Sequence, residues 1–283
     1  MISRHLIVVF AVLGGMGMLR AQEGDDHMKE ELGVNDITAP SIAQILKDFS
    51  MLRPIPLELI SSNDRDAVYD NRLQTSFHFG SLVADGFMLT IAERAQDVED
   101  VGRALIRESR ALGVSDRLTR RSKVLFEYCG KGNWQGMREE LIRTQGDVEK
   151  SMVDLRDEQI AHMISLGGWM RGFQLAANTT ATAYSADKAK ILGQADVMDY
   201  YIDRLETLHP RLKKTEFVSA LTAKLKELRT LATGPDGNAP SEAEVKKMRD
   251  VSNQLEEIAL GPVDSEGKIL PKTPATAAPP PTP

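Results

Sequence analysis

The sequence predicts an all-α protein, built as a bundle of long antiparallel helices around two largely buried helices that contain glycine. Apolar residues recur three and four positions apart through most of the chain, which places them on one face of a helix. The one cluster of β-branched residues, at 178–184, is more typical of a helix end or loop than of a strand. Two segments are apolar on every side, which indicates helices enclosed by other parts of the protein.

Residues 1–21 have the pattern of a secretory signal peptide. Arg4 supplies the positive start, residues 6–19 carry no charge, and Ala21 is a candidate cleavage point. We therefore expect an exported protein, periplasmic or extracellular, with an uncleaved N-terminal membrane anchor as the alternative. No other stretch is long and apolar enough to cross a bilayer, so no membrane span is expected after signal removal.

A polar, acidic linker is expected at 22–36, followed by a single α-helical domain at 37–262. The first helix begins near Ser41 and ends before the prolines of segment 53–60, because a proline bars the preceding residue from helical geometry. The later helices are predicted at about 65–96, 97–112, 116–129, 134–166, 168–178, 186–208, 213–232 and 242–260.

The C-terminal boundary of the domain has clear sequence signals. Ser241 and Glu244 form a predicted capping box at the start of the last helix, and Gly261 marks its end. The remaining residues, 263–283, include six prolines between Pro271 and the end of the chain. We predict that 263–283 is a disordered tail.

The two apolar segments, 77–92 and 163–177, are the predicted central helices. The first contains the ionisable residues His78 and Asp85, and the second contains Arg171 alone. Because burying an unpaired charge is costly, each charged group needs a partner inside the protein. We therefore predict an ion pair between Asp85 and Arg171.

Small residues four positions apart occur in both central segments, at Gly80 and Ala84 and at Gly168 and Gly172. Such pairs allow two helix backbones to approach closely. We predict that the two helices cross at these four residues. A kink at Gly167 and Gly168, or a ligand lying against the bare backbone, are the alternatives.

Polar side chains of the central segments are the candidate binding residues: His78, Asp85, Glu158, His162, Trp169 and Arg171. Imidazole and carboxylate groups on facing helices can bind zinc or iron. A di-iron bundle uses Glu-x-x-His twice, whereas Glu158 and His162 are four residues apart and occur once. We therefore predict no metal site and a core role for His162; the residues that would form such a site are His78, Asp85, Glu158 and His162.

Composition and motifs exclude several classes of function. The net charge of −6 is unsuited to coating nucleic acid or anionic lipid. Motifs of serine hydrolases, zinc proteases and phosphate-binding loops are missing, so we expect neither catalysis nor a cofactor. Cys129 is the single cysteine. We interpret it as a small buried residue near a helix end, with an intermolecular disulfide as the alternative.

These observations favour an exported, non-enzymatic helical binding or scaffolding protein of a bacterial-type cell envelope, with a protein or small-ligand partner. The alternative is a small-ligand or metal sensor that uses the polar groups between the two central helices. A cavity lined by those groups would favour the sensor. A closed helix crossing would favour the partner-binding protein.

Overall fold

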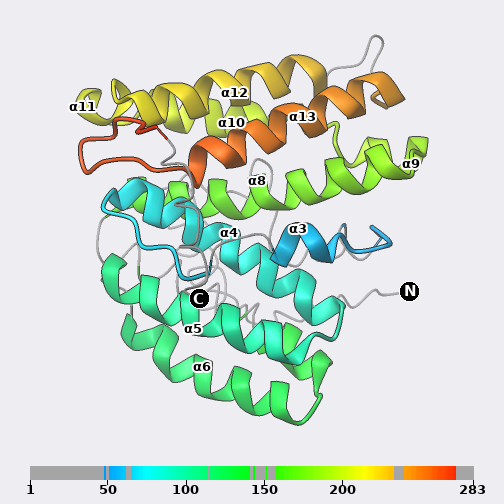
Figure 1. Ribbon diagram of the computed structural model, residues 1–283, viewed down its shortest axis with the longest axis vertical. Coiled ribbons are helices and arrows are strands. Elements are labelled where there is room, and N and C mark those ends of the chain that lie inside the picture. Colours follow the sequence, from blue (N-terminus) through cyan, green and yellow to red (C-terminus); the bar gives the residue numbers. More distant parts are fainter. Residues whose placement is uncertain are drawn as a thin grey trace, which may run out of the picture.

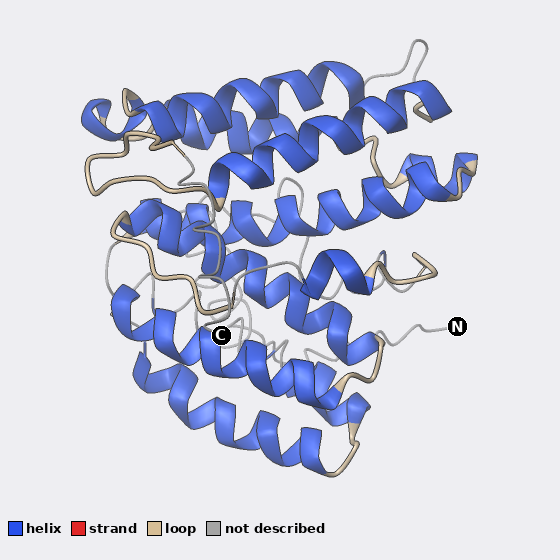
Figure 2. Ribbon diagram, in the orientation of Figure 1, coloured by secondary structure: helices blue, strands red, loops and turns tan. Residues whose placement is uncertain are grey.

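The computed structural model describes residues 51–61, 65–113, 115–140, 157–232 and 239–271, together with residues 48, 143 and 151. Within this part of the chain the protein is all-α, as Figure 2 shows, and the predicted helical-bundle class is confirmed. The predicted signal peptide, the linker, nearly all of the helix expected from Ser41, and residues 272–283 lie outside the described residues.

The helices form layers that follow one another across the molecule (Figure 1). The helices α4 and α8 lie in the middle, with α10, α12 and α13 on one side and α5 and α6 on the other. Residues 134–140 are also helical. The bounds are α3 (Leu57–Ser61), α4 (Arg72–Ile91), α5 (Ala95–Leu112), α6 (Ser115–Gly130), α8 (Glu158–Thr182), α9 (Ala186–Lys190), α10 (Ala195–Glu206), α11 (Pro210–Lys213), α12 (Glu216–Ala232) and α13 (Glu242–Ala259).

The helices α4 and α8 correspond to the two apolar segments of the sequence. In α4, every residue from Leu73 to Thr90 except Val83 is buried. In α8, burial is nearly continuous from Leu166 to Thr180. These two helices are buried on more than one face, because other helices cover them on more than one side.

The central pair runs parallel, which corrects the antiparallel arrangement predicted for the bundle. Arg72 pairs with Asp157 at the N-terminal ends of α4 and α8, and Asp85 pairs with Arg171 further along both helices. Neighbouring helices in the chain do alternate in direction. In the described part of the chain, three helical segments separate α4 from α8, namely α5, α6 and the one containing residues 134–140, so the direction of α4 recurs in α8.

Several helix boundaries differ from the predictions, and local contacts explain them. The α4 helix begins at Arg72 rather than near 65, because the side chain of Asn71 accepts hydrogen bonds from the backbone N–H groups of Leu73 and Gln74. The predicted helix at 186–208 is divided into α9 and α10 by a turn at 191–194.

The break predicted between 166 and 168 does not occur. Residues Glu158–Thr182 form one continuous helix through Gly167 and Gly168. Glycine weakens a helix because it loses more backbone freedom than other residues, but packing compensates for that loss here.

Residues 263–271, which the proline-rich pattern assigned to the tail, pack against the bundle. Phe217 N donates a hydrogen bond to Gly267 O at 2.9 Å, and Ile269 N donates to Glu216 Oε2 at 3.1 Å. Val263 is buried and forms an isolated antiparallel bridge with Ile269. This segment closes the end of the domain beside α12.

Candidate functional site

A group of polar side chains, most of them buried, lies where α13 packs on α8 and α4. We call it the buried polar cluster, and it consists of Asp85, Arg171, Gln174, Asn253 and Glu256. The carboxyl and guanidinium groups are removed from water, since Asp85 is 0%, Arg171 3% and Glu256 4% exposed. Charges buried to this degree are stable only when their neighbours compensate for the lost hydration.

Arg171 is held by several hydrogen bonds. Its Nε donates to Asp85 Oδ1 at 2.8 Å, and its Nη2 donates to Asp85 Oδ2 at 3.3 Å and to the carbonyl of Leu59 at 2.8 Å. Its Nη1 donates to Gln174 Oε1 at 2.6 Å. The structure therefore brings the predicted partners Asp85 and Arg171 together in a two-bonded ion pair, and the same guanidinium attaches α3 to the core.

The surroundings of Arg171 favour its charged form. Burial acts to lower the pKa of the guanidinium, but the charges of Asp85 and Glu256 and the hydrogen bond to Asp85 outweigh that effect and raise it. Arg171 thus stays positively charged inside the protein. The ion pair neutralises one carboxylate, and the cluster contains two.

Glu256 is the second carboxylate. Neither of its side-chain oxygens has a hydrogen-bond partner among the described residues. Burial raises the pKa of Glu256 to about 7, with the charge of Arg171 opposing the rise and that of Asp85 adding to it. A carboxyl group in such a position changes protonation near neutral pH rather than near its ordinary value.

Amides join α8 to α13 beside these charges. Gln174 Nε2 donates to Asn253 Oδ1 at 3.0 Å, and Asn178 Nδ2 donates to the same oxygen at 2.9 Å. Near the other end of α13, Gln74 Nε2 of α4 donates to the carbonyl of Ala259 at 2.9 Å. The position of α13 is therefore specified by polar contacts as well as by its apolar face.

The helices α4 and α8 make backbone contact at their glycines. A Cβ added to Gly80 would clash with the carbonyl of Ile164, and one added to Gly167 would clash with the carbonyl of Phe77. A Cβ on Gly168 would lie 3.3 Å from Gly80 O. The crossing is therefore closed where these backbones meet.

The four residues predicted for the crossing have different positions. Gly80 and Gly168 form the backbone contact, whereas Ala84 and Gly172 are buried residues of their own helices. Gly167 was assigned to a kink and instead provides the second contact point. Two adjacent glycines predict a helix break, and no local pattern in the sequence indicates that Gly167 contacts Phe77 of the other helix.

His78 belongs to a different polar contact. Its Nδ1 forms a short hydrogen bond with Glu108 Oε1 of α5, and its ring packs edge-on against Tyr69 with centroids 5.1 Å apart. His78 and Glu108 are both buried. His78 therefore faces α5, while Asp85 of the same helix faces Arg171.

The remaining candidate ligand residues do not converge on one point. Glu158 is exposed at the start of α8. His162 is partly buried, and its ring packs edge-on against Tyr200 of α10. Trp169 Nε1 donates to Gln194 Oε1 at 2.7 Å, and its indole packs against the rings of Phe173 and Tyr201.

A metal site would need several ligands around one point. Among the residues that the structure describes, no three His, Cys, Asp or Glu side chains are grouped so as to hold a metal ion. The four candidates His78, Asp85, Glu158 and His162 are used in separate contacts or exposed. What the geometry provides is a proton-binding group, Glu256, next to a fixed ion pair.

Two buried carboxylates, Glu108 and Glu256, were not among the predicted site residues, although the sequence carries a signal for both. Glu256 lies four residues after Ser252 and three before Ala259, both buried. Glu108 lies four residues after Ala104, which is also buried. Helical spacing thus places both carboxylates on inward faces, although the pattern does not reveal their partners.

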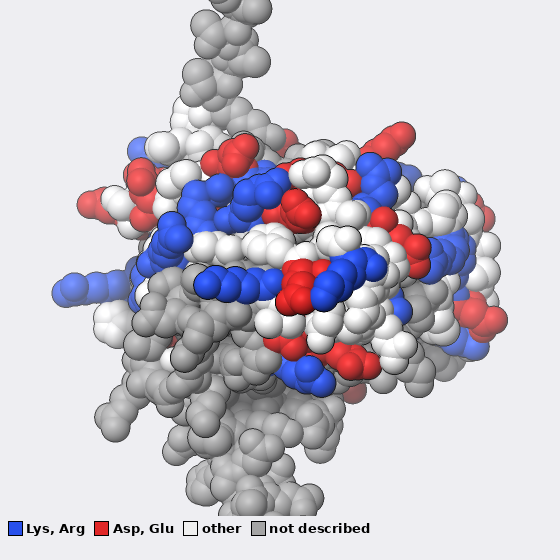
Figure 3. Space-filling view, turned by 90° about the horizontal axis from the view of Figure 1, so that it is seen from below, with Lys and Arg blue, Asp and Glu red and all other residues white. Residues whose placement is uncertain are grey.

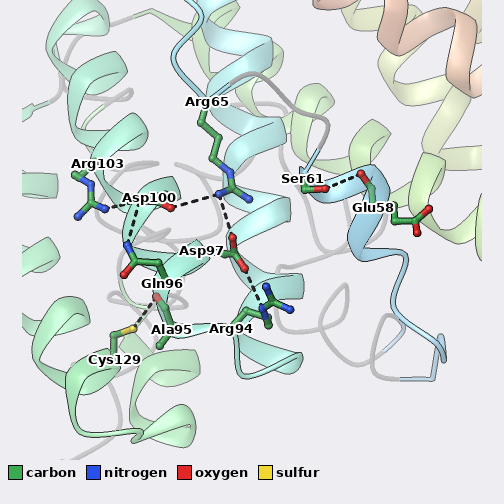
Figure 4. A network of polar contacts seen from close by, with 10 residues as sticks. All are labelled: Glu58, Ser61, Arg65, Arg94, Ala95, Gln96, Asp97, Asp100, Arg103 and Cys129. Carbon is green, nitrogen blue, oxygen red and sulfur yellow. Dashed lines mark hydrogen bonds and ion pairs between the residues drawn. The ribbon is translucent and has the colours of Figure 1, made fainter.

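Cys129 lies near the end of α6 and is buried. Its Sγ donates a hydrogen bond to the carbonyl of Ala95 at 3.3 Å, as Figure 4 shows. Burial, and then the charge of Glu99, raise the pKa of this thiol. A thiol with a raised pKa is a weak nucleophile at neutral pH, so the contact is structural.

The surface beside Cys129 carries ion pairs that join the segment before α4 to the start of α5. Arg65 Nη1 lies 3.4 Å from Asp97 Oδ1 and 3.8 Å from Asp100 Oδ2 (Figure 4). Arg94 and Arg103 pair with the same two carboxylates. Arg65, Asp97 and Asp100 are partly buried, and their ion pairs hold the segment before α4 against the start of α5.

The last findings concern membrane spans and relatives. Among the described helices, none has the length and the apolar content needed to cross a bilayer. The chain matches no protein-family model, no curated protein and no solved structure in the comparisons made with each.

Proposed function

We propose that this is an exported, non-enzymatic helical binding or scaffolding protein of the cell envelope. The observation that carries the proposal is that the polar groups of the central helices bond to the protein itself: Arg171 to Asp85, His78 to Glu108, and Trp169 to Gln194. A ligand entering between these helices would have to break such contacts and leave buried groups unpaired, at a cost of roughly 1–3 kcal/mol for each. Binding at the outer surface is therefore favoured.

The helix crossing supports the same proposal. Gly80 meets the backbone of Ile164 and Gly168, and Gly167 meets the backbone of Phe77, so there is no space for a ligand at these points. A core closed in this way gives a rigid platform for contacts made by the outer helices and loops. Rigidity favours binding because less conformational entropy is lost when a partner attaches.

Surface charge supports a protein partner over nucleic acid. Figure 3 shows that Lys and Arg are interspersed with Asp and Glu on the described part of the face seen from below. Among the described residues many Lys and Arg side chains are paired with carboxylates, as Arg103 is with Asp100. Nucleic-acid binding needs Lys and Arg that remain free to neutralise phosphates, and the whole chain has a net charge of −6.

Crosslinking in intact cells, followed by affinity capture and mass spectrometry, tests this proposal. The matched control is the same chain without residues 1–21, which would remain in the cytoplasm if the segment is an export signal. We expect envelope proteins to be enriched with the full chain and not with the shortened chain. Equal enrichment with both chains would contradict the proposed location, and no enrichment would contradict the proposed role.

One observation favours the alternative of a small-ligand or metal sensor, namely the buried carboxyl of Glu256 without a hydrogen-bond partner among the described residues. Equilibrium dialysis with metal analysis of the untagged protein tests the metal form of this alternative. Binding near about one equivalent would favour the sensor, since a built site binds stoichiometrically. Bound metal well below one equivalent per protein would contradict the metal-sensor alternative.

A further inference from the structure

Glu256 is placed where a change of charge affects the contact between two parts of the bundle. It lies on α13, which packs against α8, α12 and α4. Both of its oxygens are buried without a hydrogen-bond partner among the described residues. An ionised carboxylate in that position has lost its hydration and gained no hydrogen bond in return.

The charges around Glu256 leave its ionised form unbalanced. From α8 the facing charge is that of Arg171, and from α4 it is that of Asp85. Arg171 already makes two hydrogen bonds to Asp85. From α12, Lys224 reaches across to α13, but its Nζ bonds Gln254 and Glu227. With Glu256 neutral the buried charges sum to zero, and with Glu256 ionised they sum to one negative charge.

We propose that Glu256 is a proton-operated latch that keeps α13 docked on α8 and α4 while it is neutral and weakens that docking when it ionises. The contacts that would weaken are those of α13 with α8 and α4. They include the bond from Gln174 to Asn253 and the bond from Gln74 to the carbonyl of Ala259. The latch depends on these contacts within the fold and does not depend on the proposed export or partner.

The direction of the pH dependence follows from the raised pKa. Burial raises the pKa of Glu256 to about 7, against an ordinary value of 4.5. The docked state therefore binds a proton that the undocked state releases. The stabilisation from this group is complete below pH 4.5 and is lost as the pH rises through about 7.

Hydrogen exchange of the full chain between pH 5.5 and 8.5 tests the latch. After correction for the intrinsic exchange rate, we expect the protection of α13 amides in the unaltered protein to fall roughly 30-fold across this range. In Glu256→Gln the protection should stay nearly constant, because the side chain cannot ionise. Glu257→Gln is the matched control, since Glu257 is the exposed neighbour on the same helix, and it should behave like the unaltered protein.

Two results would overturn the latch. One is an equal pH dependence in Glu256→Gln and in the unaltered protein. The other is a protection of α13 amides equal to that of α4, α5 and α8 at every pH, because α13 would then open only by global unfolding and not by undocking. If Glu256→Gln fails to fold, the ¹³C carboxyl signal of Glu256 in the unaltered protein decides: titration near 7 supports the latch, and titration near 4.5 contradicts it.

Discussion

At the scale of single residues, Arg171 joins three helices through its hydrogen bonds. It connects α8 to α4 through Asp85, and to α3 through the carbonyl of Leu59. A buried ion pair often contributes little net stability, because desolvation offsets the attraction. Its directional hydrogen bonds do specify one packing arrangement. We infer that this pair selects the register of α4 against α8 more than it strengthens the fold.

Breaking the pair tests this inference. We expect Arg171→Met to reduce the free energy of unfolding by about 3–5 kcal/mol, because Asp85 is left buried and unpaired. The double variant Asp85→Leu with Arg171→Met should lose clearly less than the two single losses added together. Urea unfolding of all three variants gives the coupling energy.

The control for that cycle is Arg229→Met. Arg229 pairs with Asp199 at 2.8 Å on the surface, where the expected loss is at most about 1 kcal/mol. Additive losses for Asp85 and Arg171 would show that the two side chains contribute independently, which contradicts the proposed register role.

The second residue of interest is Glu256. Its contribution to stability decreases as the pH rises, whereas that of a paired carboxylate increases. A pKa raised from 4.5 to about 7 corresponds to about 3 kcal/mol of stability lost between acidic and alkaline pH. Thermal unfolding of the unaltered protein should therefore show a melting temperature that decreases from pH 5 to pH 8. A melting temperature that rises over this range would contradict the assignment.

At the scale of elements, the contact between α4 and α8 depends on the missing side chains of their glycines. Gly167→Ala puts a methyl group against the carbonyl of Phe77, which is backbone and cannot rotate away. We expect the helices to separate and the free energy of unfolding to fall by at least about 1–3 kcal/mol. Thermal or urea unfolding measures the loss.

Gly130→Ala is the matched control for that substitution. Gly130 ends α6, and an added Cβ there meets no atom within 4 Å. Because alanine favours the helix more than glycine does, we expect no loss of stability. Equal effects at 130 and 167 would indicate a general cost of alanine and would contradict the close crossing.

The sequence pattern predicts the presence of the helices more accurately than the residues at which they begin and end. The last helix begins at Ser241 with the predicted capping box, in which Ser241 and Glu244 bond reciprocally. Local signals suffice there, because every interacting group lies within four residues. The division of α9 from α10 at 191–194 is different, since Trp169 of α8 binds Gln194 at the start of α10. A contact between residues this distant in sequence leaves no local pattern.

At the scale of the whole molecule, the segment 263–271 completes the fold. It lies across the start of α12 through the bonds of Gly267 and Ile269, and Asn71 Nδ2 donates to Asp264 O at 3.4 Å. Removing residues 263–283 should therefore cost on the order of 2–4 kcal/mol, from the lost hydrogen bonds and the exposed apolar side chains.

Removing only residues 272–283 is the control, because no described contact is deleted. We expect its unfolding curve to overlay that of the full chain within about 0.5 kcal/mol, the usual effect of a surface change. If both truncations unfold alike, the packed segment contributes no stability, and the role assigned to residues 263–271 is wrong.

The amino-acid sequence alone was sufficient to predict the all-α class, the apolar character of the two central helices and the need of Arg171 for an internal partner. These properties follow from periodicity and from the cost of burying charge, and both can be evaluated along the chain. The export signal and the binding role come from the same sequence reasoning and are still predictions.

The tertiary structure was needed to show that α4 and α8 run parallel, that Gly167 contacts Phe77, and that Glu256 is a buried second carboxylate near the pair of Asp85 and Arg171. The physical reason is common to all three. Each depends on which faces of distant helices meet. Helical periodicity indicates which face of a helix is buried, but it does not indicate which residues contact that face.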